Sequence, residues 1–252
     1  MDYRSFDLTY WYNGQFLSTS DNFITEAYLT LEIKNAGRVT ILRTPGNEIA
    51  HAAGFVLSAG FIQIPEEILS AQFSEKNPDY ISLTLAKPCQ AKAISLLSDP
   101  DTAKTIVNTL SPLPLSTFIP VTKALSCLES HLHAERPLRQ KTYAAHCSSL
   151  YDLSYTSLYF AEDVGRHNAL DKAIGFLFLQ KKLSEAQILT LSSRISLELV
   201  QKAAFARIPI VLAKARPTSA AILLAQRLQI TLACLDQNNG LFVFSAPERL
   251  LP

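Results

Sequence analysis

The sequence contains little of what marks a metal site, a membrane span or a nucleic-acid surface. Its four cysteines lie 38, 20 and 87 positions apart, so no close pair is available for a zinc site or a dithiol couple. The longest apolar runs, such as 208–213, are far shorter than a membrane span. The 23 basic and 22 acidic residues nearly cancel, and no basic cluster is present. We therefore expect no binding to bulk nucleic acid or to a membrane, and any anionic ligand must be bound locally.

What the sequence does contain is the composition of a globular protein, with 48% hydrophobic and 18% charged residues. A chain of this length buries roughly 70 to 75% of its unfolded surface, in one domain or two. The first residues, 1–5, lead into polar and aromatic side chains rather than into an apolar signal segment. We therefore expect a cytoplasmic protein, whose thiols stay reduced.

The first half of the chain is predicted to consist of strands and one helix. The pair Asn13-Gly14 separates two aromatic-rich runs, and residues 35–37 separate two further apolar runs, which predicts two hairpins. Apolar residues keep helical spacing from 47 to a stop at Gly60, and residues 79–86 alternate as a strand.

A connection and a helix follow this first half. Prolines are scattered among polar residues from 87 to 120, which indicates a connection between two lobes. A helix is predicted over 121–133. Its apolar face is expected to consist of Ala124, Leu125, Leu128 and Leu132. His131 and His133 are two positions apart and cannot share a face as metal ligands, so we expect both at the surface.

The second half alternates strand-like and helix-like runs, which predicts an α/β fold with a mainly parallel sheet covered by helices. The expected strands are 156–160, 188–191, 209–213, 230–235 and 241–245, and the expected helices are 168–180, 195–206 and 218–228. In the helix 168–180 the apolar side chains form one stripe, and Asp171 and Lys172 are expected to face away from it. The polar residues at the start of this helix are then free to bind a ligand.

The most informative segment is the polar run 162–172, where a strand gives way to a helix. Two later junctions, 192–194 and 214–219, also place a cation next to the start of a helix. If the strands are parallel neighbours, the three loops meet at one edge of the sheet, where helix N–H groups and cations form a cradle for phosphate. Acidic residues of the run would accept hydrogen bonds from a heterocycle, so a nucleotide-like ligand is predicted. For the two later loops, simple helix capping is the alternative.

The segment Glu162 to Lys172, EDVGRHNALDK, resembles the signature of the formate dehydrogenase accessory sulfurtransferase family, FdhD. Other segments resemble further motifs of the family, in the same order along the chain. They are Arg43 to Gly46 with Ala53 to Phe55, Thr142 to His146, Ser193-Arg194 with Glu198 and Lys202, Pro217 to Ser219, and Pro247 to Arg249. The resemblance therefore covers nearly the whole chain.

The resemblance implies a protein that binds the molybdenum cofactor, Mo-bis-pterin guanine dinucleotide, as cargo and helps to sulfurate it for formate dehydrogenase. The sulfur would come from a cysteine desulfurase. The resemblance also implies an α/β/α domain similar to the cytidine deaminase fold over 116–252, beside a smaller α+β lobe with the connecting segment over 1–115. The zinc signature of the deaminases, H-x-E with P-C-x-x-C, is absent, so we expect no zinc. A symmetric homodimer is compatible with such a role.

The candidate cofactor-binding residues come from the three loops and from the matched motifs. We expect them to bind a ligand that contains a guanine nucleotide. They are His146, Glu162, Asp163, Arg166, His167, Asn168, Asp171, Lys172, Ser193, Arg194, Thr218 and Ser219.

The chain departs from the family where sulfur would be carried. The family typically has a C-G-x-C-G loop between its two parts, and this chain has only Cys89 in that region, next to two lysines that favour a thiolate. Cys89 is therefore the first candidate for sulfur carriage, and Cys147, which follows His146, is the second. Cys127 and Cys234 are expected in the core.

The chain also departs from the family in the expected pocket. Tyr143, Ala144, Ser193 and Arg216 stand where the family usually has glycine or a small residue. Glycine lets the backbone approach a ligand closely, so larger side chains here are expected to narrow the site.

Two functions from different classes therefore stay open. One is an active sulfurtransferase in which Cys89 accepts sulfur. The other is a non-catalytic protein that binds or delivers the cofactor and has lost the persulfide chemistry. A hydrolase built on His167 and Asp163 is a third alternative, but the sequence has no identifiable nucleophile elbow or metal set for it.

Overall fold

The computed structural model describes residues 2–87, 108–238 and 240–252, and its largest element is a six-stranded sheet in the order β13-β12-β11-β10-β8-β9. The strands are β8 (His146–Tyr151), β9 (Ser157–Asp163), β10 (Ile188–Leu191), β11 (Ile210–Ala213), β12 (Thr231–Leu235) and β13 (Leu241–Ser245). Every residue of β10 and β11 is buried, because these short runs of branched apolar residues are covered on both faces.

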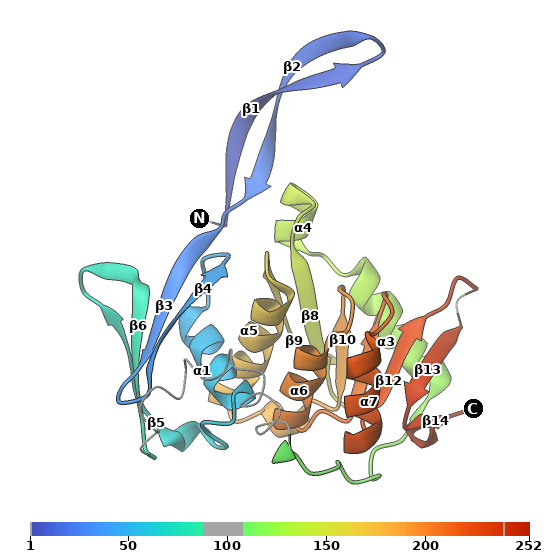
Figure 1. Cartoon of the computed structure of the whole chain (residues 1–252). Coiled ribbons are helices and arrows are strands. Elements are labelled where there is room, and N and C mark those ends of the chain that lie inside the picture. The colour runs from blue at the N-terminus through green and yellow to red at the C-terminus, as the bar shows by residue number, and fades with distance from the viewer. Residues whose placement is uncertain (1, 88–107, 239) are drawn as a thin grey trace.

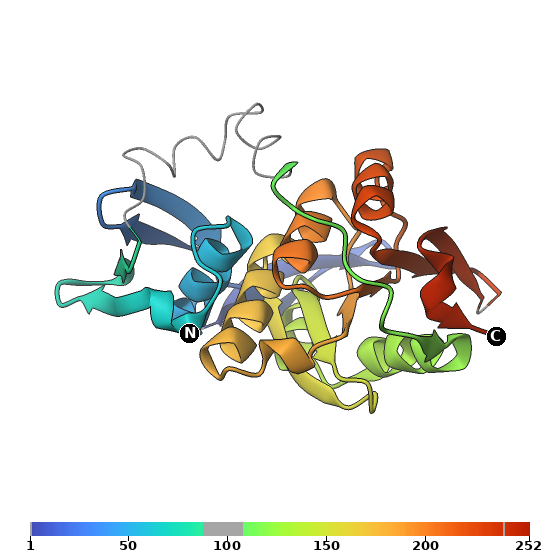
Figure 2. The ribbon, with the colours of Figure 1, turned by 90° about the horizontal axis from the view of Figure 1, so that it is seen from below.

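Helices cover both faces of this sheet (Figures 1 and 2). One face carries α5 (Arg166–Leu179), α6 (Leu197–Phe205) and α7 (Ser219–Leu228). The other face carries α3 (Val121–His133), whose Ala124 and Leu128 belong to a second, smaller apolar cluster under the sheet. Short strands β7 (Ile119–Pro120) and β14 (Leu250–Leu251) pair beside it. No described helix combines the length and the apolar character needed to cross a bilayer.

The N-terminal part holds a four-stranded sheet, a helix and a long hairpin. The sheet has the order β4-β3-β6-β5, formed by β3 (Ala27–Ile33), β4 (Gly37–Arg43), β5 (Ile68–Ser74) and β6 (Asn77–Leu85). Alternate residues of β3 are fully buried, and the helix α1 (Glu48–Ser58) packs between this sheet and α5. The hairpin of β1 (Tyr3–Tyr12) and β2 (Gln15–Ile24) projects away from the body of the molecule (Figure 1).

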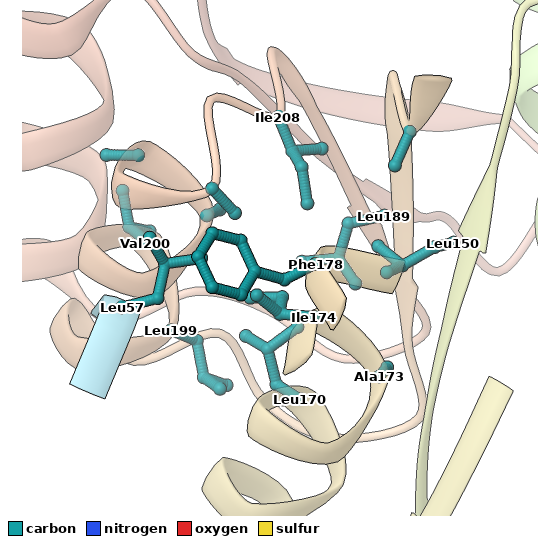
Figure 3. Close-up of a cluster of buried hydrophobic side chains, with 14 of the residues drawn as sticks. Leu57, Leu150, Leu170, Ala173, Ile174, Phe178, Leu189, Leu199, Val200 and Ile208 are labelled. Carbon is teal, nitrogen blue, oxygen red and sulfur yellow. The ribbon is translucent and has the colours of Figure 1, made fainter. Parts of the chain in front are cut away.

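The main hydrophobic core joins the two halves of the chain. It includes Leu29 from β3. Leu57 from α1 packs with Leu170, Ile174 and Phe178 from α5 in the same core (Figure 3). The helices α1 and α5 approach so closely that a Cβ atom on Gly54 would overlap the carbonyl group of Asp171, and one on Gly175 would overlap that of Ala50. Two glycines thus allow backbone to pack directly on backbone.

The structure confirms many of the expected elements. Both hairpins form, with Asn13 and Gly14 at positive φ in the first turn, and the helix after Asn47 ends before Gly60. The strands over 188–191 and 241–245 and the helix over 121–133 have the expected bounds.

Two expectations about the second half were wrong. The sheet is not mainly parallel, because only β11 pairs in parallel with both of its neighbours, β10 and β12, and the other three pairings are antiparallel. Two of these three pairings involve β8, a strand rich in polar residues that the pattern did not indicate, and the third pairs β13 with β12. His131 is fully buried rather than exposed, because its Nδ1 lies 2.8 Å from the hydroxyl of Ser149 on β8.

We expect Gly54→Ala and Gly175→Ala each to lower the free energy of unfolding by about 2 kcal/mol or more, because an added methyl group must push α1 away from α5. Chemical denaturation measures the effect. The matched control is Gly240→Ala, where the nearest atom to an added Cβ is 3.9 Å away and a change within about 0.5 kcal/mol is expected. Equal stabilities for all three variants would show that the helix contact does not need the glycines.

Candidate functional site

The three polar loops expected from the sequence lie along one edge of the six-stranded sheet. Strands β9, β10 and β11 run in the same direction, although the antiparallel β8 lies between β9 and β10. The loops are joined to one another: the Nε2 of His167 lies 3.2 Å from the hydroxyl of Ser196, and Ile195 forms a β-bridge with Pro217. The amino end of β8 is at this edge too, with His146 opposite Asp163. One continuous rim therefore carries residues from all three loops.

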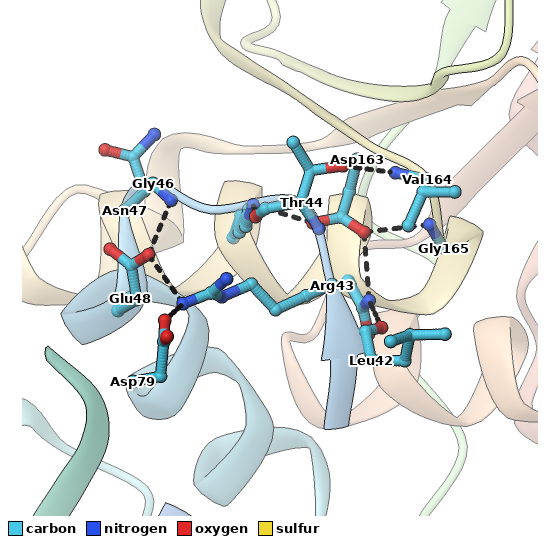
Figure 4. A network of polar contacts seen from close by, with 12 residues as sticks. Leu42, Arg43, Thr44, Gly46, Asn47, Glu48, Asp79, Asp163, Val164 and Gly165 are labelled. Carbon is cyan, nitrogen blue, oxygen red and sulfur yellow. Dashed lines mark hydrogen bonds and ion pairs between the residues drawn. The ribbon is translucent and has the colours of Figure 1, made fainter. Parts of the chain in front are cut away.

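The buried carboxylate of Asp163 is the centre of the first loop (Figure 4). Its Oδ2 lies 2.7 Å from the Nζ of Lys172 and accepts a hydrogen bond from the backbone N–H of Thr44 at 3.1 Å. Its Oδ1 accepts from the N–H of Gly165 and from the side-chain amide of Asn168. Four donors thus satisfy one carboxylate inside the protein.

The same contacts fix the N-terminal part against the C-terminal part. The Nζ of Lys172 also donates to the carbonyl oxygen of Thr44 at 2.7 Å, and the amide of Asn168 donates to the carbonyl oxygen of Leu42. Arg43, 1% exposed, forms ion pairs with Glu48 and Asp79 next to this contact. The two segments are about 120 positions apart in the sequence, and the polar network holds them together.

A second buried ion pair involves Asp171, the residue of α5 that directly precedes Lys172. The carboxylate of Asp171 accepts two hydrogen bonds at 2.8 Å from the Nζ of Lys202 and one from the hydroxyl of Ser58. Burial raises the pKa of Asp171, and the nearby lysine opposes that rise. Asp171 and Lys172 are each 2% exposed, so the expectation that they face outward was wrong.

Four of the candidate ligand-binding residues are therefore already used by the fold. They are Asp163, Asn168, Asp171 and Lys172. The sequence predicted that the polar residues at the start of α5 are free to bind a ligand. This is wrong for Asn168, which is buried and whose side-chain nitrogen donates to the carbonyl oxygen of Leu42 and to Asp163. Sequence spacing gave no sign of this, because several of their partners, such as Thr44, Ser58 and Lys202, lie on other segments of the chain.

Glu162 also has a structural partner. Its two oxygens accept hydrogen bonds from the backbone N–H groups of Leu138 and Arg139, at the start of the short helix α4 (Pro137–Thr142). This helix leads into β8, and Arg139 donates to the carbonyl oxygen of Ala145 just before His146. Glu162 therefore positions the segment that carries His146 on the rim.

His146 reports a positive potential at the rim. Burial lowers its pKa, and the guanidinium groups of Arg166 and Arg139 lower it further. A histidine in this setting is neutral at pH 7. The Nε of Arg166 is buried and has no hydrogen-bond partner among the described residues. Neutral imidazole and an unpaired guanidinium nitrogen together form a site suited to an anion.

His167 has a partner that was not among the candidate binding residues, although it lies in a matched motif. Its Nε2 lies 2.9 Å from a carboxylate oxygen of Glu198 on α6, and this contact lowers the pKa of Glu198. Lys202 follows Glu198 by one turn and binds Asp171. Glu198 and Lys202 both belong to a segment that resembles a family motif. Their spacing of four positions places them on one face of α6, and this was the feature of the sequence that could have indicated a shared role.

The second and third loops present cations and helix starts. Arg194 is exposed, while the hydroxyl of the buried Ser193 donates to the carbonyl oxygen of Arg194. Thr218 caps α7 by accepting a hydrogen bond from Ala221, as the capping alternative expected, and Ser219 is exposed. No side-chain cap is present at the starts of α5 and α6, so their first N–H groups lack that partner.

Two of the residues that replace small family residues have clear structural settings. Tyr143 has φ of 55°, in the left-handed region that favours glycine, and its side chain is 78% exposed. Arg216 lies over the ring of Phe242, with 4.7 Å between the guanidinium carbon and the ring centroid. Tyr143 therefore points into solvent at the rim rather than filling the interior.

The cysteines separate clearly by burial. Cys147 is 2% exposed, and burial raises its pKa to about 11, so it is a thiol at neutral pH and the structure argues against it as a nucleophile. Cys127 and Cys234 are buried, as expected for core residues. Cys89, the first candidate, lies outside the described residues.

A cavity of about 680 Å³ adjoins the rim on the side of β9. It is lined by Tyr3 at the base of the hairpin, by residues 44–47, by α4 and by residues 157–162 of β9, with Lys172 at its inner wall.

Comparison with known proteins agrees with the positions of these motifs. The family model described as the FdhD/NarQ family matches residues 24–251. The chain belongs to the FdhD/NarQ family. A protein named sulfur carrier protein FdhD from Bordetella bronchiseptica is 30% identical over 243 residues, covering 92% of this chain and 88% of the relative. One of the same name from Thermoplasma acidophilum is 28% identical, covering 97% and 92%.

A solved structure of the same fold is also known. It is described as that of a proposed formate dehydrogenase accessory protein from Desulfotalea psychrophila. The TM-score is 0.80 at 23% identity, over 99% of both chains. The fold of this FdhD/NarQ member, including its N-terminal part, therefore has a close structural counterpart.

We expect Asp163→Asn to lower the free energy of unfolding by about 3 to 5 kcal/mol, because the buried Lys172 then lacks its charged partner. Urea denaturation measures the loss. The control is Glu66→Gln, which removes an ion pair with Lys181 at the surface and should leave the unfolding midpoint nearly unchanged. If Asp163→Asn unfolds at the wild-type midpoint, the buried pair does not hold the two parts together.

The buried histidines should make stability fall in mild acid. Burial lowers the pKa of His131 from 6.5 to about 3 and lowers those of His51 and His146 as well. Below pH 6.5 the unfolded chain takes up protons that the folded chain does not, so unfolding is favoured as the pH falls. For His131 the loss is about 1.4 kcal/mol per pH unit between 6.5 and its folded pKa. Denaturation at several pH values should show a shallower slope for His131→Gln, and identical slopes would contradict this account.

Proposed function

We propose that this protein is a formate dehydrogenase accessory protein that carries sulfur to a molybdenum cofactor held at the rim of its six-stranded sheet. Membership in the FdhD/NarQ family and relatives named sulfur carrier protein FdhD support the role. The observation that carries the binding part is the unpaired Nε of Arg166 at the rim, in a setting that also includes His146 and Arg139. The cofactor is the cargo of this protein, and a cysteine desulfurase is the proposed sulfur donor.

The donor set at the rim fits the phosphate groups of a pterin guanine dinucleotide. The unpaired Nε of Arg166 and the exposed Arg194 supply cations, and the starts of α5 and α6 supply N–H groups without side-chain caps. Phosphate oxygens accept from both kinds of donor. Asp163 and Asp171 form buried ion pairs within the protein, so they are not available to a ligand. We propose that His146, His167 and Glu198 contact the heterocyclic part of the cofactor instead.

The sulfur-carrying step requires a thiolate, and burial of a cysteine disfavours the thiolate. The three described cysteines are all buried. Burial raises the pKa of Cys127 and Cys147 to about 11 and raises that of Cys234. Cys89 is therefore the candidate that we propose for accepting sulfur as a persulfide. Its thiolate would attack the outer sulfur of a persulfide on the desulfurase cysteine, so that the S–S bond there breaks, a new S–S bond forms on Cys89, and the desulfurase cysteine leaves as a thiolate.

The alternative is a protein that binds and delivers the cofactor without carrying sulfur. The absence of the family's cysteine pair from the sequence favours it. Both functions use the same rim, so they differ in the fate of sulfur and agree on the binding of nucleotide.

For the fold, we propose that residues 116–252 form a domain similar to the cytidine deaminase fold and that 1–115 form the smaller lobe. The mixed sheet with helices on both faces supports the proposed similarity of residues 116–252 to the cytidine deaminase fold.

Sulfur transfer is tested by incubating the protein with a cysteine desulfurase and radiolabelled cysteine. The sulfurtransferase function predicts label that thiols release, located on Cys89 by peptide mapping and lost in Cys89→Ala. Cys147→Ala should retain the label because Cys147 is buried. A protein that takes up no label but still binds the nucleotide is the delivery protein of the alternative.

Nucleotide binding is tested with guanosine diphosphate by calorimetry. We expect Arg166→Ala and Arg194→Ala each to weaken binding roughly 10-fold or more, since each removes a charge-assisted contact worth about 1.5 to 3 kcal/mol. Arg38→Ala removes an exposed arginine from β4, away from the rim, and should leave the affinity unchanged. An equal loss in all three variants would mean that binding follows overall charge and that the rim is not the site.

A further inference from the structure

The strand β9 has a strand neighbour on one side only. It is the outermost strand of the six-stranded sheet, and within the described part of the chain it pairs with β8 alone. A free edge offers a row of N–H and C=O groups to another chain, and proteins usually protect such an edge with proline, charge or a covering element. The middle of β9, residues 159–161, contains neither proline nor a charged residue.

The pairing with β8 determines which groups of β9 point outward. In an antiparallel pair, residues that bond to the neighbouring strand alternate with residues that point away from it. Cys147 of β8 directs its carbonyl oxygen toward β10, where it accepts from the N–H of Ser192 at 3.1 Å. Glu162 lies opposite Cys147, and Phe160 is two positions earlier on β9. The N–H and C=O groups of Phe160 and Glu162 therefore point away from β8.

The next outward group along this edge is already used by the fold. The N–H of Val164 follows the same alternation, and it donates to the hydroxyl of Thr44 at 3.1 Å (Figure 4). The N-terminal segment thus occupies the edge at that point. The main-chain groups of Phe160 and Glu162, in contrast, have no hydrogen-bond partner within residues 2–87, 108–238 and 240–252.

The cavity of about 680 Å³ lies along this open stretch of β9. Six consecutive residues of the strand, 157–162, line it, although consecutive residues point their side chains to opposite faces of a sheet. The cavity therefore follows the edge of the strand rather than one face of the sheet. We call this cavity the edge groove; the rest of its lining is residues 2–3, 44–47, 137–138, Lys141 and Lys172.

The lining of the edge groove offers apolar contact at its α4 side. Phe160 is 38% exposed, and Pro137 and Leu138 line the same cavity. Alternate side chains of an added strand point to one face, so an apolar side chain there would meet these three residues.

Two charged side chains of the edge groove, Lys141 and Asp2, have no ion-pair partner among the residues that the structure describes. The Nζ of Lys141 lies 3.2 Å from the hydroxyl of Tyr3 and over its ring, which leaves its charge uncompensated. A carboxylate on the occupant would compensate it. Asp2 lines the same groove and disfavours a polyanion, so the edge groove suits an acidic peptide better than a nucleotide.

We propose that an extended segment of a protein partner adds to β9 in the edge groove, with its main chain bonded to Phe160 and Glu162 and a carboxylate side chain at Lys141. Strand addition of this kind takes affinity from main-chain bonds and specificity from alternate side chains. The partner is the cofactor-free client, formate dehydrogenase, and this choice rests on the proposed function. Glu162 also belongs to the first loop of the rim, so the bound segment holds the client next to the cargo.

The probes are overlapping peptides from the formate dehydrogenase of the same organism, about 12 residues long, roughly twice the length of a typical strand. Fluorescence anisotropy measures their binding to the full-length protein. We expect an acidic peptide to bind. Changing its acidic residue to glutamine should weaken binding to the wild-type protein and should have no effect on binding to Lys141→Ala.

Methylation of the peptide's backbone nitrogens, one at a time, tests the main-chain pairing without altering the protein. Only every second N–H of an added strand faces β9, so the losses of affinity should alternate along the peptide. Each N–H that faces β9 should account for a loss of about 10-fold or more. A loss that does not alternate overturns strand addition.

Phe160→Pro and Phe160→Ala form a matched pair of variants. Both remove the ring, but only proline removes the outward N–H, which is not bonded to β8 and can be lost from an edge strand. The proline variant should bind the peptide about 10-fold more weakly than the alanine variant. Circular dichroism checks that both are folded, and equal affinities of the two folded variants contradict the proposal.

Hydrogen exchange shows whether the edge is open before the partner arrives. The amides of Phe160 and Glu162 should exchange rapidly in the protein alone and slowly with the peptide bound. Slow exchange without peptide means that another surface, such as a second copy of the chain, covers the edge, and it rejects the proposal. If guanosine diphosphate binds and no peptide does, strand addition fails and the proposed function stands. If a peptide binds with the alternating pattern and guanosine diphosphate does not bind, strand addition stands and the cofactor-binding rim fails.

Discussion

The architecture depends on a buried carboxylate, Asp163, that is shared by two distant segments. Its charge is balanced by Lys172, and its remaining acceptor capacity is filled by backbone and amide donors, including the N–H of Thr44. A buried charge is tolerated only when it is paired and hydrogen-bonded in this way. The N-terminal segment therefore completes the network, and the rim of the sheet has its shape only when both parts of the chain are in place.

This arrangement separates residues that build the rim from residues that face a ligand. Asp163, Asn168, Asp171 and Lys172 form buried contacts between elements. Burial and two arginines outside this network, Arg166 and Arg139, lower the pKa of His146. Some polar residues of the run 162–172 thus hold elements of the fold together, and others are available to a ligand. The buried residues are those that hold the fold together.

Local patterns predicted much of the fold. Apolar periodicity found β10, β13 and α3 with the bounds that they have, since their spacing needs no partner to be read. It missed β8 and α4 for a physical reason. β8 is rich in polar residues whose partners lie on other elements, and α4 is a six-residue helix whose first N–H groups are capped by Glu162, more than twenty positions away. The burial of His131 was missed because Ser149 supplies its partner across the sheet.

The close contact of α1 with α5 determines how the two lobes of this chain meet. Because Gly54 and Gly175 bring main chain against main chain, the relative orientation of the two lobes is set by atoms that every residue type shares. Substitution of the surrounding side chains changes how they pack around the contact. It does not remove the main-chain contact that sets the relative orientation of the two lobes. A protein that shares 23% of its residues with this chain has the same overall fold, with a TM-score of 0.80 over 99% of both chains.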